Sequence, residues 1–199
     1  MHSSESDSVP LTYQSKGRQK MVQVRTDAAV VDLKRLCIHK LDLGPLSSCK
    51  RMHTLRLGSN NISEIDIKPL AECTNLRYLH LYRNQLESID LSALASCENF
   101  MALSLNENRI QEIDLTPLGE CRNLRGLYIK RNRLEQIDIE PLQNCPDLRE
   151  INLSFNRLHN VALAPLDDCD HLERIDLRGN PIEETDLTHM KESVDIMID

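Results

Sequence analysis

The stretch Leu103-Ser104-Leu105-Asn106-Glu107-Asn108-Arg109-Ile110 has the pattern L-x-L-x-x-N-x-I, which returns every 24 residues. The copies are Leu55/Leu57/Asn60/Ile62, Leu79/Leu81/Asn84/Leu86, Leu103/Leu105/Asn108/Ile110, Leu127/Ile129/Asn132/Leu134, Ile151/Leu153/Asn156/Leu158 and Ile175/Leu177/Asn180/Ile182. Six copies at one unbroken period indicate a solenoid, in which each short unit stacks on its neighbours around one continuous core.

Each copy can be translated into local structure. Leu103 and Leu105 alternate with Ser104, so on a short strand the leucines point inward and the serine points outward. At Asn108 the chain leaves the strand, where backbone N–H and C=O groups lose their partners and an amide side chain can bond both kinds. Stacked once per unit, the six asparagines should form a ladder. We expect Asn108, in mid-stack, to contribute more to stability than Asn60 near the end.

The second half of each unit is also regular, as Ile113–Leu124 shows with the pattern I-D-L-x-P-L-x-x-C-x-x-L. Proline suits the first position of a short helix because its missing N–H would be unpaired there anyway. The cysteine recurs at the same place in six units, at Cys49, Cys73, Cys97, Cys121, Cys145 and Cys169. A free cysteine packs as a small buried hydrophobe. We therefore expect reduced thiols in the core and neither disulfides nor a zinc site.

A column of aspartates accompanies the helical turns, at Asp42, Asp66, Asp90, Asp114, Asp138 and Asp186, with Ala162 as the one break. Aspartate side chains accept hydrogen bonds from nearby backbone N–H groups in Asx turns, which is the interpretation favoured here. A calcium ladder is the alternative. It is disfavoured because calcium needs several oxygen ligands for each ion, and the neighbouring residues are isoleucine and leucine.

These repeats resemble those of the leucine-rich repeat superfamily over most of the chain. The resemblance implies an α/β solenoid, or horseshoe, of about seven coils, with a parallel β-sheet on its concave face. Short extended and helical segments would form the convex face. The last motif, Asn180-Pro181-Ile182, is similar to the final repeat of intracellular members of the phosphatase-regulatory-subunit type, although the aromatic cap usual in that group is missing.

The regions outside the regular repeats divide the chain further. Residues 1–20 are rich in Ser, Gln and Lys without periodicity, which predicts a disordered N-terminal tail. Residues 21–199 form the repeat domain: an atypical N-terminal capping repeat at 21–50, regular repeats at 51–180 and a C-terminal cap at 181–199. Met21–Val24 and Val194–Ile198 alternate apolar and polar residues, so each is predicted to form a covering strand.

Composition excludes several classes of function. The chain has 199 residues, 40% of them hydrophobic, and a formal net charge of −7, which argues against a general nucleic-acid binder. It has neither an apolar run long enough to span a membrane nor a recognisable signal peptide, so we expect a cytoplasmic or nuclear protein. Phosphate loops, nucleophile elbows and clustered histidines are missing from the sequence. An enzyme is therefore not expected, and neither is a cofactor or a metal.

The outward side of the sheet can be defined from the period. We call the positions equivalent to Ala102, Ser104, Asn106 and Glu107 in the seven units, from residues 30–35 to residues 174–179, the concave face. It holds three of the four tyrosines, and its eight Lys/Arg exceed its four Asp/Glu, so it is basic while the rest of the chain is acidic. Solenoids commonly bind through this face, and tyrosine and arginine dominate binding hot spots.

The sequence therefore predicts a protein-interaction module, a scaffold or regulatory subunit that is monomeric and binds a partner with an acidic surface. The partner-binding residues are predicted to be Arg56, Tyr78, His80, Tyr82, Arg83, Tyr128, Lys130 and Arg131. Small residues, Ala102 and Ser104, lie between the two groups of tyrosines. Two alternatives remain: nucleic-acid binding through the same face, and the recognition domain of a larger signalling protein.

Overall fold

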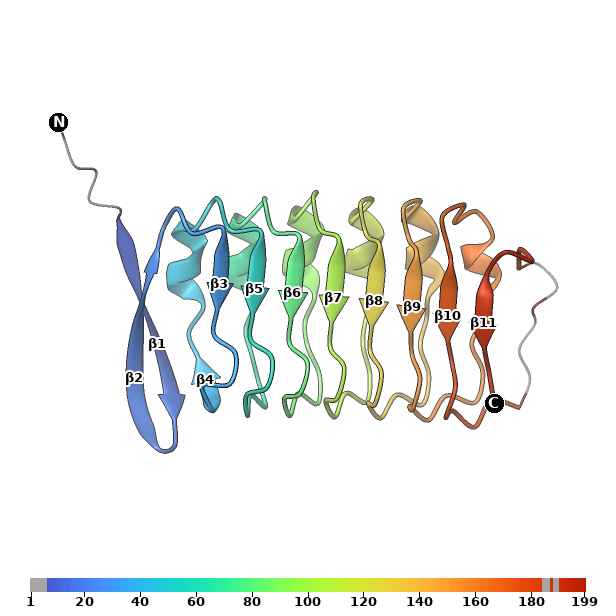
Figure 1. Cartoon of the computed structure of the whole chain (residues 1–199), viewed down its shortest axis with the longest axis horizontal. Helices are drawn as coiled ribbons and strands as arrows, with labels where there is room; N and C mark the ends of the chain where they lie inside the picture. The colour runs from blue at the N-terminus through green and yellow to red at the C-terminus, as the bar shows by residue number, and fades with distance from the viewer. Residues whose placement is uncertain (1–6, 184–186, 188–189) are drawn as a thin grey trace.

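The computed structural model describes residues 7–183, 187 and 190–199. Its main feature is a parallel sheet of eight strands that follow one another in a row (Figure 1). The strands are β3 (Val30–Asp32), β5 (Thr54–Arg56), β6 (Tyr78–His80), β7 (Ala102–Ser104), β8 (Gly126–Tyr128), β9 (Glu150–Asn152), β10 (Arg174–Asp176) and β11 (Asp195–Met197). Neighbouring strands of the repeats pair at a shift of one period, as Leu79 and Leu103 do. The predicted solenoid is confirmed.

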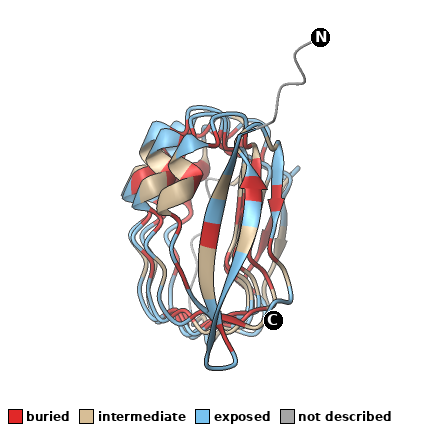
Figure 2. Cartoon of the chain, turned by 90° about the vertical axis from the view of Figure 1, so that its left-hand side faces the viewer, coloured by how far each residue is buried: buried red, intermediate tan, exposed pale blue. Residues whose placement is uncertain are grey.

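In the described residues, six coils carry a short 3-10 helix on the side opposite the sheet (Figure 2). These helices are η1 (Gly44–Ser48), η2 (Lys68–Glu72), η3 (Ser92–Ser96), η4 (Thr116–Glu120), η5 (Glu140–Asn144) and η6 (Ala164–Leu166). Five of the six have the predicted proline as their second residue. Before each of the first five, an aspartate Oδ1 accepts a hydrogen bond of 2.8–2.9 Å from the backbone N–H two residues later. This confirms the Asx interpretation of the column for those five. Asp186 lies outside the described residues.

The asparagine ladder is confirmed in full. Oδ1 of Asn108 accepts a hydrogen bond from Leu86 N–H at 3.1 Å, and its Nδ2 donates to the carbonyls of Leu81 at 3.0 Å and Leu105 at 2.9 Å. Asn60, Asn84, Asn132, Asn156 and Asn180 repeat the arrangement in their own coils. Each side chain therefore ties its own turn to the preceding coil.

The six column cysteines are free and buried, as predicted. The five from Cys73 onward have Sγ 3.2–3.8 Å from a leucine carbonyl of the preceding helical turn, so each thiol can donate a weak hydrogen bond between coils. Burial raises the pKa of the thiols, to about 11 for Cys73 and about 12 for Cys121 and Cys145. The column therefore serves packing between coils. Cys37, which lies outside it, is only half-buried.

This difference predicts one reactive thiol in the folded protein. Ellman's reagent should modify about one cysteine, Cys37, within minutes, because buried thiols of raised pKa are protonated and inaccessible. All seven should react in denaturant. The variant Cys37→Ser should reduce the native reaction almost to zero, and rapid modification of several thiols in that variant would contradict the burial of the column.

Residues 7–25 differ from the sequence prediction. β1 (Ser8–Ser15) and β2 (Arg18–Arg25) form an antiparallel hairpin, so the disordered tail predicted for residues 1–20 is wrong for residues 7–20, and residues 1–6 lie outside the described part. Lys16 and Gly17 form the turn with φ of 50° and 71°, the left-handed conformation that two-residue hairpin turns require. The strand predicted at Met21–Val24 is confirmed within β2.

The hairpin is ordered because it covers the open end of the core (Figure 2). β1 pairs with β4 (Ile38–Leu41) of the first coil, and Leu11 becomes fully buried. At the other end β11 pairs with β10, and Val194, Ile196 and Ile198 pack against the last coil, which confirms the second covering strand. Each end of the solenoid is thus closed by a strand with alternating apolar residues.

Candidate protein-binding face

The outward columns of the concave face lie where the period places them. On β6, Tyr78 and His80 flank the buried Leu79 and are themselves half-buried. β7 lies next to it with the small residues Ala102 and Ser104, and β8 follows with Tyr128 opposite Ser104. Arg56 ends β5, whereas the remaining predicted residues, Tyr82, Arg83, Lys130 and Arg131, lie in the turns after β6 and β8.

The turn after each strand has a backbone feature that the sequence analysis missed. The residue at the Glu107 position of each coil, the fourth of the outward positions and called here the fourth column, has a left-handed backbone in all seven coils. These residues are Arg35, Ser59, Arg83, Glu107, Arg131, Phe155 and Gly179, with φ from 54° to 69°. This conformation is strained for residues other than glycine and persists only where surrounding contacts impose it. Gly179, which stands at this position in the last coil, was the sequence signal for a left-handed backbone. The consequence is a row of side chains along one rim of the concave face.

Three aromatic residues line up on β6 and the turn after it. The rings of Tyr78 and His80 stack with centroids 6.4 Å apart, and those of His80 and Tyr82 meet edge to face, also at 6.4 Å. Burial, and then the nearby charges of Arg56 and Lys34, lower the pKa of His80. His80 is therefore neutral at pH 7 and adds an uncharged surface to the row.

Three rings of the concave face lie against glycines. A methyl group on Gly58 would lie 2.6 Å from the Tyr82 ring, and a methyl group on Gly126 would lie equally close to the Tyr128 ring. Phe155 covers Gly179 in the same way, again at 2.6 Å. Because only glycine leaves this space, these rings are held close to the backbone. Phe155 and the three glycines were not among the predicted site residues.

Tyr128 is fixed further by a hydrogen bond. Its Oη donates to Oε2 of Glu150 on β9 at 3.0 Å. Burial and this bond raise the pKa of Tyr128 to about 12, so the phenol stays protonated and remains a donor. Fixed aromatic rings lose little conformational entropy when a partner binds, which favours them as contact residues.

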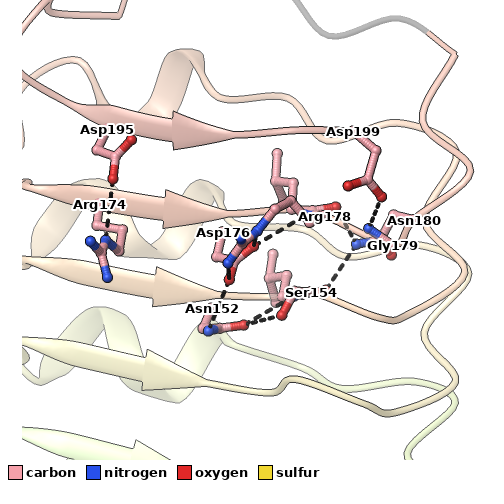
Figure 3. A network of polar contacts seen from close by, with 11 residues as sticks. Asn152, Ser154, Arg174, Asp176, Arg178, Gly179, Asn180, Asp195 and Asp199 are labelled. Carbon is pink, nitrogen blue, oxygen red and sulfur yellow. Dashed lines mark hydrogen bonds and ion pairs between the residues drawn. The ribbon is translucent and has the colours of Figure 1, made fainter.

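The basic charge of the concave face is partly neutralised by its own carboxylates. Arg56 lies 3.4 Å from Asp32, and Arg83 lies 3.1 Å from Glu107. Near the C-terminus Arg174 pairs with Asp195, and Arg178 makes two hydrogen bonds to the buried Asp176 (Figure 3). The face is therefore less uniformly basic than the residue count suggests. The cations without such a carboxylate partner are the ones that remain available to a binding partner.

No cluster of three or more His, Cys, Asp or Glu side chains within residues 7–183, 187 and 190–199 is placed to hold a metal ion. In the same ranges, none of the helices has the length and apolar character required to cross a membrane.

The chain can now be compared with known proteins. The family model described as "Leucine rich repeat" matches residues 50–110, 74–134 and 122–182. Among solved structures, an internalin C2 of Listeria monocytogenes aligns with a TM-score of 0.67 and 20% identity, over 89% of this chain and 84% of its own. An internalin of the inlF type from the same organism aligns with a TM-score of 0.61 and 21% identity, over 89% of this chain and 58% of its own. At such identities the likeness shows the fold alone. No curated protein is significantly similar to the chain.

Proposed function

Because this chain belongs to the leucine-rich repeat family, we propose that it is a non-enzymatic protein-interaction module that binds a partner protein with its concave face. Leucine-rich repeats suggest this general role, and the finer proposal rests on the site. The partner presents an acidic surface, and the protein acts as a monomeric scaffold or regulatory subunit in the cytoplasm or nucleus.

The observation that carries the proposal is the set of aromatic rings on the sheet. Tyr78, His80 and Tyr82 make a continuous row, and Tyr128 lies two coils further on, about 10 Å along the solenoid. All four are half-buried on a rigid support, so each offers apolar area with a polar edge. Such residues form hot spots when a partner covers them. The six buried thiols support a reducing compartment.

The test removes two rings that lie outside the core. Tyr82→Ala combined with Tyr128→Ala should weaken binding of the protein captured from native cells by about 100-fold, since two hot-spot side chains are lost. Circular dichroism should stay unchanged. The control, Glu64→Lys with Glu112→Lys, changes exposed residues away from the sheet and should retain the partner.

If the Glu64/Glu112 variant loses the partner and the Tyr82/Tyr128 variant keeps it, the acidic surface away from the sheet binds the partner instead. Affinity should also be measured at several salt concentrations, because nucleic-acid binding falls steeply with salt through counterion release. A protein partner held by aromatic contacts should show only a weak dependence.

A further inference from the structure

Phe155 is an unusual residue on the concave face. The residue is 45% exposed although its side chain is large and apolar. Its backbone is left-handed, with φ of 57°, a conformation that is rare for a bulky residue. The ring covers Gly179, where any larger residue would collide with it. The structure thus holds an apolar ring at the surface, in a fixed place and at a conformational cost.

Two cations lie over this ring. Nζ of Lys130 is 5.2 Å from the ring centroid, and the guanidinium carbon of Arg131 is 4.9 Å from it. These distances fall within the range of cation–π attraction, which orients the two side chains without neutralising their charges. Phe155, Lys130 and Arg131, named here the Phe155 cluster, therefore combine one apolar ring with two positive charges.

The charges of this cluster are unpaired for a structural reason. The fourth column reads Arg83, Glu107, Arg131, Phe155 and Gly179 along five successive coils. Glu107 stands between two arginines, and its Oε2 bonds Arg83 at 3.1 Å. On its other side Arg131 meets Phe155 instead of a second carboxylate. Within the described part of the chain, neither Lys130 nor Arg131 makes an ion pair, unlike Arg83 and Arg178.

We propose that the Phe155 cluster is a second binding subsite of the concave face, which takes a carboxylate beside an apolar side chain in an acidic segment of the partner protein. This inference rests on the proposed function and names the chemistry of the partner. A carboxylate between Lys130 and Arg131 would supply the ion pairs that this chain leaves open. The adjacent apolar side chain would cover the exposed part of the ring.

The spacing connects this cluster to the tyrosines. Phe155 follows β9, the strand next to Tyr128, and lies three coils beyond Tyr82. Three coils correspond to about 15 Å at strand spacing, a length that about five extended residues cover. One short acidic segment can therefore contact both tyrosines and the Phe155 cluster.

Charge also favours a peptide over a nucleic acid. A single strand of nucleic acid needs a continuous basic groove along its backbone. Here the concave face carries the carboxylates Glu107, Glu150 and Asp176 as well as the two cations, in a protein with a net charge of −7. Several phosphates in a row would meet these carboxylates, whereas one or two carboxylates of a peptide fit between them.

The experiment measures fluorescence anisotropy with a labelled random copolymer of glutamate and tyrosine at physiological salt. Lys130→Gln with Arg131→Gln should weaken binding at least ~10-fold, because two charge-assisted contacts are lost. Arg109→Gln with Arg133→Gln removes the same charge from exposed residues that follow the ladder asparagines, and it should change affinity less than ~2-fold if contacts rather than net charge decide. Phe155→Leu, which keeps an apolar group and removes the cation–π contacts, should give an intermediate loss.

Two results would overturn the inference. Equal losses in the two double variants would mean that net charge alone attracts the copolymer. The second result is a labelled oligothymidylate that binds more tightly than the copolymer. If Lys130→Gln with Arg131→Gln also abolishes that binding, the ligand of the cluster is a nucleic acid and not a peptide.

The native partner separates this inference from the proposed function. If the Tyr82/Tyr128 variant loses that partner while the Lys130/Arg131 variant keeps it, the concave face binds and the Phe155 cluster does not contribute. If neither variant loses it, both proposals are wrong. Loss in both variants supports both.

Discussion

Replacing Phe100 with alanine is expected to lower the free energy of unfolding by about 4 kcal/mol, within the range for a large core side chain that leaves a cavity. Phe100 is fully buried and is the largest such side chain among the residues that the structure describes. The equivalent position holds Met52, Leu76, Leu124, Leu148 and Leu172 in other coils, all of them buried. The ring therefore fills space between coils that cannot close around alanine without moving both neighbours.

The matched variant is Phe100→Leu, which introduces the residue that most other coils use. It should cost only about 1 kcal/mol because leucine stays apolar and keeps most of the volume of the ring. Urea denaturation followed by circular dichroism gives both values. Equal midpoints for the two variants would show that the coils relax around the missing ring, and that the core at this coil is less tightly packed than the structure indicates.

The period alone determined most of the fold. Strand, asparagine turn, helical turn and cysteine each occupy a constant place in the unit, so one decoded copy predicts the rest. The hairpin was not predicted because Val9, Leu11 and Tyr13 lie among polar residues. These three side chains are buried or half-buried only when the hairpin packs against the first coil. Composition measures a segment by itself, whereas this segment is stabilised by docking. Its alternation and the Lys16-Gly17 turn were the local signals for a hairpin.

The candidate site was predictable in position and less so in chemistry. Counting residues placed Tyr82, Tyr128 and the cations on one face, because each strand and the turn after it recur at a constant period. The choice of Arg83 as the partner of Glu107 depends on rotamers within one column, and a sequence does not contain them. Phe155 lies in that column, but its role in binding depends on the space above Gly179 and on two cations from another coil.

The second large effect is expected for Asn108→Ala, which should cost about 3 kcal/mol because it leaves one buried N–H unpaired and removes two further buried hydrogen bonds. The N–H of Leu86 loses its acceptor, whereas the carbonyls of Leu81 and Leu105 each keep one hydrogen bond, from Asn84 and Asn132. Alanine can neither donate nor accept in place of the asparagine amide, which lies at a position only 8% exposed. Urea denaturation again measures the loss.

The structure makes Asn180, rather than Asn60, the ladder asparagine whose loss should cost least. Asn60 was expected to matter less than Asn108, but its side chain bonds four backbone groups, including the N–H of Leu36 and of Ile38, so Asn60→Ala should cost as much. Asn180 is the true end of the stack and is only half-buried, so Asn180→Ala should cost about 1 kcal/mol, since water can reach its partners. Equal losses for Asn108 and Asn180 would contradict this account.

The ladder also supports the binding face, so Asn108→Ala should have an effect beyond stability. Asn108 holds the turn in which Glu107 is left-handed, and Glu107 is the residue that engages Arg83 and leaves Arg131 free. When the asparagine is lost, the strained turn loses the contacts that impose it and should relax. Glutamate–tyrosine copolymer binding should then weaken at a urea concentration where the protein is still folded. Unchanged affinity under those conditions would show that the turn keeps its conformation without the ladder.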